Sequence, residues 1–343
     1  MSKRSQPDFS HPGFRLLIAV CIGSIAAAYC LASMKATNGA RVADDFTWHW
    51  LGARALIEGK DPYVVVQAGG QYDLIAPYIY PLTTAILIVP FALFLSPIIA
   101  AAVFVGLSTT LLAWGLTRDG YQRLPLFLSI PFLWAAGSGQ FSPILAASAL
   151  IPALGWLAPI KPQLGLATLA YRPSRAALAG SVAFVGVAFM VNPNWITEWR
   201  ESLTRRVPGI YWMPVTVFGG PLLLLAISRW RRPEGRLLLI LSLAPQLFLF
   251  YDQLLLWLIP RTLRESVLLS AMSVVALFLG NQRLSVNPVT MVVSSYAPII
   301  IALLYLPCLI MLLRRPNEGE VPRWVERLLQ QSRQMLGRLS RAK

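Results

Sequence analysis

Apolar runs recur along this sequence, and many of them approach the length of a helix that crosses a bilayer. Such a helix needs about 20 consecutive apolar residues, because backbone polar groups inside the hydrocarbon must be bonded within the helix. Of the 343 residues, 56% are hydrophobic and 13% are charged, which is typical of a polytopic membrane protein. The runs lie at residues 14–34, 80–96, 97–116, 124–137, 141–159, 162–171, 175–192, 212–228, 237–251, 253–260, 265–281 and 288–313.

These runs predict an all-α fold, a polytopic transmembrane helical bundle of about twelve spans with a long first external loop at residues 35–79. Several runs are too short to span alone unless they tilt or pair as half-helices. Prolines within or beside many runs predict kinked or broken helices that line a cavity. We assign residues 1–315 to one membrane domain and residues 316–343 to a basic, amphipathic cytoplasmic tail.

The net charge of +15 comes mainly from basic residues at the ends of the apolar runs. There they would face anionic lipid headgroups and fix the orientation of the chain, and they form no basic groove that would bind nucleic acid. With the amino terminus inside, twelve spans put residues 229–236 and the tail inside, and residues 41–82 and 117–123 outside. The three cysteines and two histidines lack metal-ligand spacing, so we expect no metal and no other cofactor.

The loop at residues 41–82 gathers five of the fifteen acidic residues beside the membrane. They are Asp44, Asp45, Glu58, Asp61 and Asp73. Trp48 and His49 follow the first two acids closely. A carboxylate held beside aromatic rings at the membrane surface is suited to take a proton from a sugar hydroxyl while the rings stack on the sugar. The alternative is an ordinary aromatic belt with two solvated acids.

Three further polar residues stand in or beside apolar runs. Lys161 is flanked by apolar residues, so it either snorkels to an interface or binds an anion such as a lipid-linked phosphate. Asp252 lies within a long apolar run, which makes it a functional candidate, and the alternative is a cap on a helix break at the outer surface. Gln140 either binds a polar substrate or caps a helix.

Residues 192–214 alternate aromatic residues with charged ones. The pattern predicts an interfacial helix on the same side as the acidic loop, able to cover the site and to offer Arg205 and Arg206 to a phosphate. A surface helix that only binds lipid headgroups is the alternative.

Several short motifs follow one another in the amino-terminal half of the chain. They are Asp45-Phe46, ARALIEGKDPY at residues 53–63, YIYP at residues 78–81, Gly139-Gln140 and KPQLGL at residues 161–166. In this order they resemble the bacterial integral-membrane mannosyltransferases of GT-C type that use polyprenyl-phosphate mannose, a family often described only as a domain of unknown function. The chain departs from that family in a shorter segment between Gln140 and Lys161, and in YIYPL where the family has YxYPP.

The resemblance implies a GT-C-like fold and inverting transfer of a hexose, mannose in the family, from a polyprenyl-phosphate donor to a lipid-linked or glycan acceptor. The reaction would take place on the external face of the bacterial cytoplasmic (inner) membrane. Carried over to this sequence, Asp45 is the general base, with Asp44 as the alternative. Tyr80 and Lys161 lie along the donor site, with Lys161 near the phosphate, and Asp252 falls where the family often has a polar group facing the site.

Two other classes of function compete with the enzyme. A transporter or flippase of a lipid-linked saccharide would also need broken helices and a buried acid. Five carboxylates on one outer loop favour the glycosyltransferase, which needs a base at the boundary between lipid and water. A structural partner of another membrane enzyme is the third alternative, and it predicts that neither Asp45 nor Lys161 matters to activity.

Overall fold

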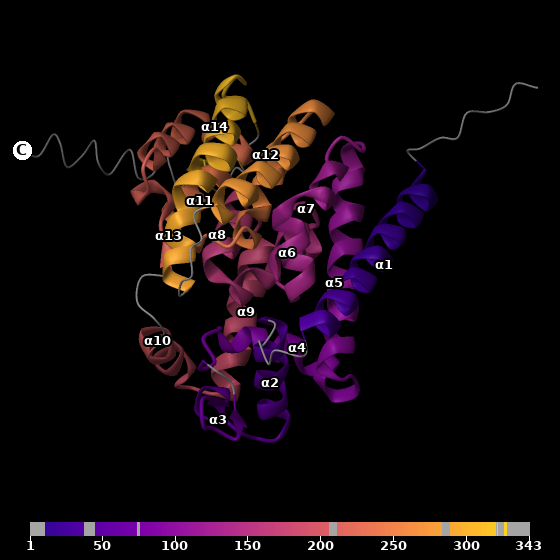
Figure 1. The fold of residues 1–343 in the computed structure, drawn as a ribbon, viewed down its shortest axis with the longest axis vertical. Helices are drawn as coiled ribbons and strands as arrows, with labels where there is room; N and C mark the ends of the chain where they lie inside the picture. Colours follow the sequence, from indigo (N-terminus) through magenta and orange to yellow (C-terminus); the bar gives the residue numbers. More distant parts are fainter. Residues whose placement is uncertain are drawn as a thin grey trace, which may run out of the picture.

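Helices make up almost all of the described chain in this computed structural model (Figure 1). The structure describes residues 11–37, 45–73, 76–205, 211–282 and 289–319, with residue 321 and residues 326–327. Within these ranges four helices are long and apolar enough to cross a membrane. They run over Pro12–Ala36, Pro97–Asp119, Leu263–Asn281 and Ser295–Leu313. The prediction of an all-α chain is confirmed, together with the presence of apolar helices of membrane-spanning length.

The count of spans differs from the prediction. The four long helices correspond to α1 (Pro12–Thr37), α5 (Pro97–Leu116), α12 (Leu263–Asn281) and the continuous series α13 (Val289–Ile300), η7 (Ile301–Tyr305) and α14 (Leu306–Leu313). A fifth is added if α9 (Arg175–Val191) and α10 (Trp195–Arg205) are counted as one span, although the chain bends by 89° between them. The described residues therefore do not support the predicted bundle of about twelve spans.

The remaining apolar runs fold as short elements. Both α6 (Ile130–Ser138) and α7 (Ser142–Leu150) have 9 residues, so at 1.5 Å per residue each is about 14 Å long, roughly half the hydrocarbon thickness. Each begins with a proline in its first turn, where the missing N–H needs no helical partner. The other short elements are α2 (Asp45–Ile57), α3 (Pro62–Val65), α4 (Leu82–Phe94), η1 (Thr117–Asp119), η2 (Leu124–Leu128), η3 (Pro152–Ile160), α8 (Pro162–Tyr171), η4 (Pro214–Thr216), η5 (Gly220–Arg229), α11 (Pro233–Leu243) and η6 (Tyr251–Leu258).

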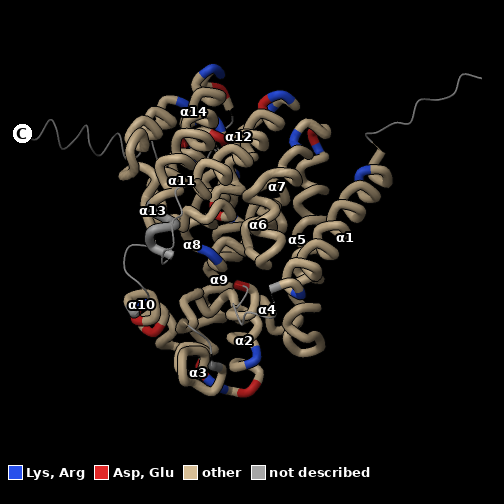
Figure 2. The backbone as a smooth tube through the Cα atoms, in the orientation of Figure 1, with Lys and Arg blue, Asp and Glu red and all other residues tan. Residues whose placement is uncertain are grey.

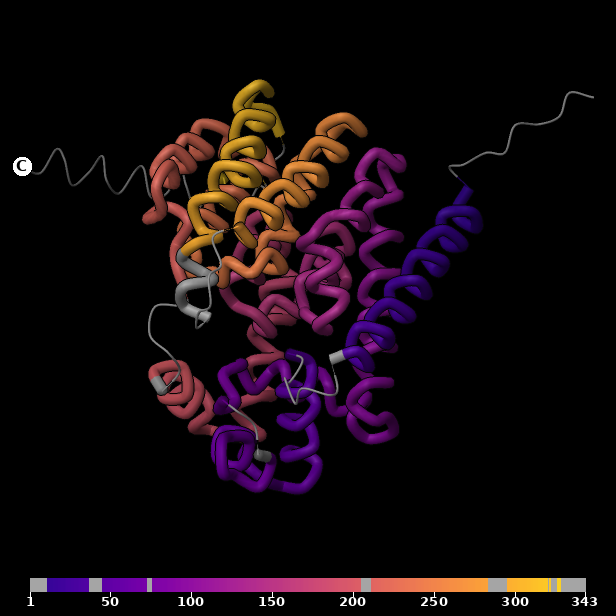
Figure 3. The backbone as a smooth tube through the Cα atoms, in the orientation of Figure 1, coloured from indigo at the N-terminus to yellow at the C-terminus, as the bar shows by residue number. Residues whose placement is uncertain are grey.

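Most charged residues of the described chain gather at two ends of the molecule (Figure 2). We call one of them the loop end; it is formed by α2, α3, α4 and α10 (Figure 3). The other is the arginine end, which comprises residues 117–123, 229–236, 261–265 and 314–318. The apolar body between the two ends has the charge distribution expected of a protein that sits in a bilayer.

Residues 117–123 lie at the same end as the start of α1. Arg15 Nη2 donates a hydrogen bond to the carbonyl oxygen of Trp114 at 2.9 Å, and α1 runs beside α5 (Figure 1). The prediction that residues 117–123 lie on the side opposite the amino terminus is therefore wrong. The cause is α4, whose 13 residues extend about 20 Å and are too short to cross, so that α5 is the next helix after α1 with the length and composition of a span.

Two very short sheets connect segments near the loop end. The strands β1 (Val66–Gln67) and β2 (Tyr72–Asp73) are parallel, and β3 (Tyr211–Trp212) and β4 (Gln246–Leu247) are antiparallel. The second sheet aligns Tyr211 with Leu247 and so holds the chain that follows α10 against the chain that precedes η6. All eight residues of η6 are buried, so Asp252, its second residue, enters the apolar body.

Candidate active site

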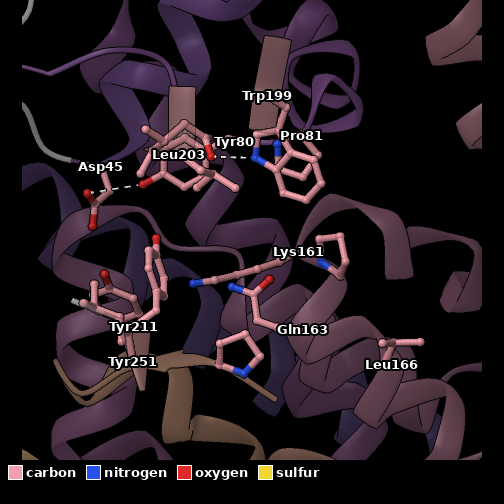
Figure 4. Close-up of a pocket in the computed structure, with 14 residues that line it drawn as sticks. Asp45, Tyr80, Pro81, Lys161, Gln163, Leu166, Trp199, Leu203, Tyr211 and Tyr251 are labelled. Atoms are coloured by element: carbon pink, nitrogen blue, oxygen red, sulfur yellow. Dashed lines mark hydrogen bonds between the residues drawn. The ribbon is translucent and has the colours of Figure 1, made fainter. Parts of the chain in front are cut away.

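A cavity of about 450 Å³ lies between the loop end and the apolar body (Figure 4). It is lined by Asp45, Ile79, Tyr80, Pro81, Lys161, Pro162, Gln163, Leu166, Trp199, Leu203, Tyr211, Pro245, Leu247 and Tyr251. Most of these side chains are apolar or aromatic, and Asp45 and Lys161 are the charged residues among them. Such a cavity suits a ligand that has both an apolar and a polar part.

Asp45 is the first residue of α2, where the helix dipole favours a negative charge. The hydroxyl of Tyr80 donates to its Oδ1 at 3.5 Å, and the side-chain amide of Gln140 donates to its Oδ2. Gln140 follows Gly139, which ends α6 with a φ of +70°, and a Cβ at Gly139 would lie 2.6 Å from the Cβ of Phe46. A glycine is thus required at the turn that brings the amide to the carboxylate.

Lys161 directly precedes α8, and its ammonium is paired with Asp252. The Nζ atom lies 2.5 Å from Asp252 Oδ1 and 4.8 Å from the centroid of the Tyr251 ring. Asp252 has no exposed surface, and its Oδ2 accepts a hydrogen bond from the backbone N–H of Leu247 at 3.0 Å. Lys161 therefore lines the cavity, whereas Asp252 lies behind it and is absent from the described lining.

The backbone immediately before Tyr251 and Asp252 is strained. Phe250 has a φ of +67°, in a region that residues other than glycine rarely adopt. Its ring is held between those of Trp134 and Tyr296, with centroid distances of 5.6 and 5.2 Å. The next two residues, Tyr251 and Asp252, both contact Lys161, so the strained turn positions the partners of the lysine.

Trp199 on α10 is a lining residue that the sequence analysis did not single out. Its indole N–H donates to the carbonyl oxygen of Ile79 at 2.8 Å, and its ring stacks on Trp195 with a centroid distance of 5.9 Å. The alternation of aromatic and charged residues in 192–214 was a signal for this helix. The sequence could not show which tryptophan faces the cavity, because that depends on how α10 is docked.

His49 and Trp48 lie near the cavity but not among its described lining residues. His49 is fully buried, with its ring centroid 4.0 Å from that of Tyr80 and 4.3 Å from that of Phe141. Burial lowers the pKa of His49 well below its usual range, and the nearby charge of Lys161 lowers it further, so the ring is neutral at pH 7. Trp48 instead donates to the carbonyl oxygen of Ala76 at 3.1 Å.

Of the other four acids in residues 41–82, two have described partners and the side chains of the other two lie outside the described residues. Asp61 caps α3 by accepting from the backbone N–H of Tyr63 at 2.9 Å, and Glu58 lies 2.6 Å from Lys60 Nζ. Asp44 and the side chain of Asp73 lie outside the described residues, as do Arg206 and the side chain of Arg205. Of the described acidic side chains in this loop, Asp45 is therefore the one that lines the cavity.

The described residues hold no group of three or more His, Cys, Asp and Glu side chains that could bind one metal ion. Comparison of the chain with protein-family models, curated proteins and solved structures finds no match.

Proposed function

We propose that this protein is a membrane glycosyltransferase of GT-C type that moves a hexose from a polyprenyl-phosphate donor to a lipid-linked or glycan acceptor. The observation that carries the proposal is the joint presence of Asp45 and Lys161 in one largely apolar cavity. A carboxylate can accept the proton of an acceptor hydroxyl, and an ammonium can stabilise a phosphate, so the pair supplies both charges that the reaction needs. Mannose as the hexose, and the external face of the bacterial inner membrane as the location, are proposed on the resemblance of the motifs alone.

The proposed reaction is a single inverting displacement. Asp45 takes the proton of the acceptor hydroxyl while the hydroxyl oxygen attacks the anomeric carbon of the sugar. The bond from that carbon to the phosphate oxygen breaks, and its electron pair stays on the phosphate. The charge that develops on the leaving phosphate is stabilised by Lys161, whose ammonium has three N–H donors and uses one toward Asp252.

The composition of the cavity wall supports an amphipathic substrate. The aromatic residues Tyr80, Trp199, Tyr211 and Tyr251 offer flat faces of the kind that stack on sugar rings. Leu166 and Leu203 add apolar surface from α8 and α10. The volume of about 450 Å³ is in the range of small-molecule sites and accommodates a sugar phosphate with the first part of its lipid chain.

The test is transfer of labelled sugar from polyprenyl-phosphate mannose to a membrane-lipid acceptor pool by the purified protein. We expect the wild type to form product with inverted anomeric configuration and Asp45→Asn to lose transfer by a factor on the order of 10² to 10⁴. Glu58→Gln is the matched control, because Glu58 is an acid of the same loop that pairs with Lys60 outside the described cavity lining. Full transfer by Asp45→Asn would eliminate the assigned base.

A transporter or flippase of a lipid-linked saccharide is the second candidate. The ion pair between Lys161 and Asp252 favours it, because buried charges in membrane proteins often mark a transport pathway. In sealed vesicles that contain the purified protein, a transporter would move the lipid-linked saccharide across the bilayer without forming a new glycosidic bond. The glycosyltransferase forms that bond in detergent, where there is no second compartment.

A further inference from the structure

Two carboxylates belong to the region of Lys161, Asp45 on the cavity wall and Asp252 behind it, and the structure pairs the ammonium with Asp252. Asp252 Oδ1 lies 2.5 Å from Lys161 Nζ. Asp45 shares the lining of the same cavity with the lysine. Opposite charges attract more strongly at low local dielectric, so a lysine free to move would be drawn toward either acid.

An ion pair between Lys161 and Asp45 would block both proposed roles. Asp45 can act as a base only while its carboxylate is accessible to the acceptor hydroxyl. Lys161 can stabilise the departing phosphate only while its N–H groups are available to that phosphate. The pair would also occupy the space in which the two substrates must meet. Keeping the two charges apart is therefore a requirement of the site.

Asp252 is fixed firmly enough to hold the lysine. The backbone N–H of Leu247 donates to its Oδ2 at 3.0 Å, and the side chain is fully buried. Its chain neighbour Gln253 is bonded as well: Gln253 Nε2 donates to Gln246 Oε1 at 3.1 Å, and the Tyr305 hydroxyl donates to the same oxygen at 2.6 Å. A carboxylate bonded in this way does not follow the lysine into the cavity, so it restrains the ammonium at the wall.

We propose that Asp252 is a positioning residue that acts through Lys161: it holds the ammonium at the cavity wall, oriented toward the donor phosphate and separated from Asp45. The proposal rests on the proposed function. It gives Asp252 a role different from the substrate contact expected from the sequence, because the side chain lies behind the lysine and not on the described cavity lining.

The test is a cycle of four proteins: the wild type, Asp252→Asn, Lys161→Met and the variant with both substitutions. Asparagine keeps the shape of Asp252 and can still accept from Leu247, but it lacks the charge that holds the lysine. We expect Asp252→Asn to lower kcat/KM per folded molecule on the order of 100-fold. In the Lys161→Met background the same substitution should change kcat/KM by less than about 3-fold, because the residue through which it acts is gone.

A second variant protects the test against misfolding. Lys161→Met leaves Asp252 as a buried, unpaired charge, which is destabilising. Lys161→Met combined with Asp252→Leu removes both charges, and such apolar replacements of buried ion pairs often preserve stability. We expect this protein to unfold at a temperature close to that of the wild type and to transfer no better than Lys161→Met. Normal transfer by it would show that the ion pair only supports the fold.

The outcomes separate the two proposals. If the wild type transfers sugar and Asp252→Asn is equally active, the positioning role is overturned and the proposed function stays in place. The positioning role is also overturned if Asp252→Asn lowers kcat/KM as much in the Lys161→Met background as in the wild type, because Asp252 would then act independently of the lysine. Absence of transfer by the wild type with polyprenyl-phosphate mannose, glucose and galactose donors overturns both proposals.

Discussion

The arginine end and the cavity both hold buried acids beside basic side chains, but they arrange the charges in different ways. At the arginine end, Glu234 Oε1 lies 2.7 Å from Arg261 Nε and 3.7 Å from Arg315 Nη1. Arg315 also pairs with Glu265, with 2.8 Å between Nη2 and Oε2. Each of these acids is directly matched by arginine.

At the cavity, the two charges on the wall have different described partners. Asp45 accepts from the uncharged donors of Gln140 and Tyr80. Lys161 is paired with Asp252, which lies behind the wall. A negative and a positive side chain thus line one cavity, where both can act on a ligand.

At the arginine end the charges stabilise the fold, whereas under the proposed function those at the cavity act on the substrates. Arginines at the arginine end also satisfy helix carboxyl termini, as when Arg229 Nη2 donates to the carbonyl oxygen of Leu313 at 2.9 Å and Arg236 Nε donates to that of Ala170 at 2.7 Å. There, opposite charges and helix ends neutralise one another. At the cavity, by contrast, Asp45 and Lys161 line a space that a ligand can enter.

The largest expected effects come from removing one acid in each region. Glu234→Gln should lower the free energy of unfolding by about 2 to 3 kcal/mol and should leave transfer per folded molecule unchanged. The figure is below that for a fully buried ion pair because Arg261 is half exposed and solvent screens its charge. Asp45→Asn should strongly lower transfer per folded molecule and change the free energy of unfolding by less than about 1 kcal/mol. Thermal unfolding and transfer assays on the same preparations measure both. Equal losses of transfer in the two variants would remove the distinction between the regions.

Gln140 tests whether orientation of the base matters at the cavity. Gln140→Ala removes the amide that bonds Asp45, and we expect kcat to fall on the order of 10-fold because the carboxylate loses its fixed position. Gln122→Ala is the control, because Gln122 is an amide at the arginine end that donates to the carbonyl oxygen of Asp119. An unchanged kcat in Gln140→Ala would mean that the bond from Gln140 is not needed to orient Asp45.

His49 gives the cavity region a pH dependence of stability. Its pKa is depressed in the folded protein, so below pH about 6.5 the unfolded chain binds a proton that the folded chain does not. The contribution of the neutral ring is present in full above that pH and is lost as the pH falls, by up to about 1.4 kcal/mol per pH unit. Unfolding of wild type and His49→Phe between pH 7.5 and pH about 5 measures the difference in slope. Parallel curves for the two proteins would contradict the expectation.

Trp199 is expected to have the smallest effect. Trp199→Ala should raise KM for one of the two substrates by about 3- to 10-fold through loss of ring stacking, and Trp199→Phe should raise it less. Trp156→Ala serves as the control, because that ring packs against Phe184 away from the described cavity lining. A change in kcat without a change in KM would give Trp199 a role other than sugar binding.

Several residues show which features of the cavity the sequence could indicate and which it could not. Asp45 and Lys161 were singled out because a loop acid beside aromatic residues and a lysine among apolar residues are unusual locally, and the structure brings both to one cavity. The bond from Gln140 to Asp45 could not be predicted, because it depends on the turn at Gly139 and on how closely that turn approaches Phe46 of α2. The apolar run around Asp252 indicates a buried acid, but its partner Lys161 lies 91 positions away in the sequence.

The sequence by itself determined the all-α class, the apolar helices of membrane-spanning length and the concentration of charge outside them, because these follow from local composition and the length of each apolar run. Tertiary structure decided how many of those runs form a helix long enough to cross alone. A short run broken at proline or glycine can cover the thickness of the hydrocarbon only by packing against another. It also decided the end at which residues 117–123 lie, and the pairing of Lys161 with Asp252. Packing brings together residues that are distant in the sequence, and the burial that results sets which charges meet.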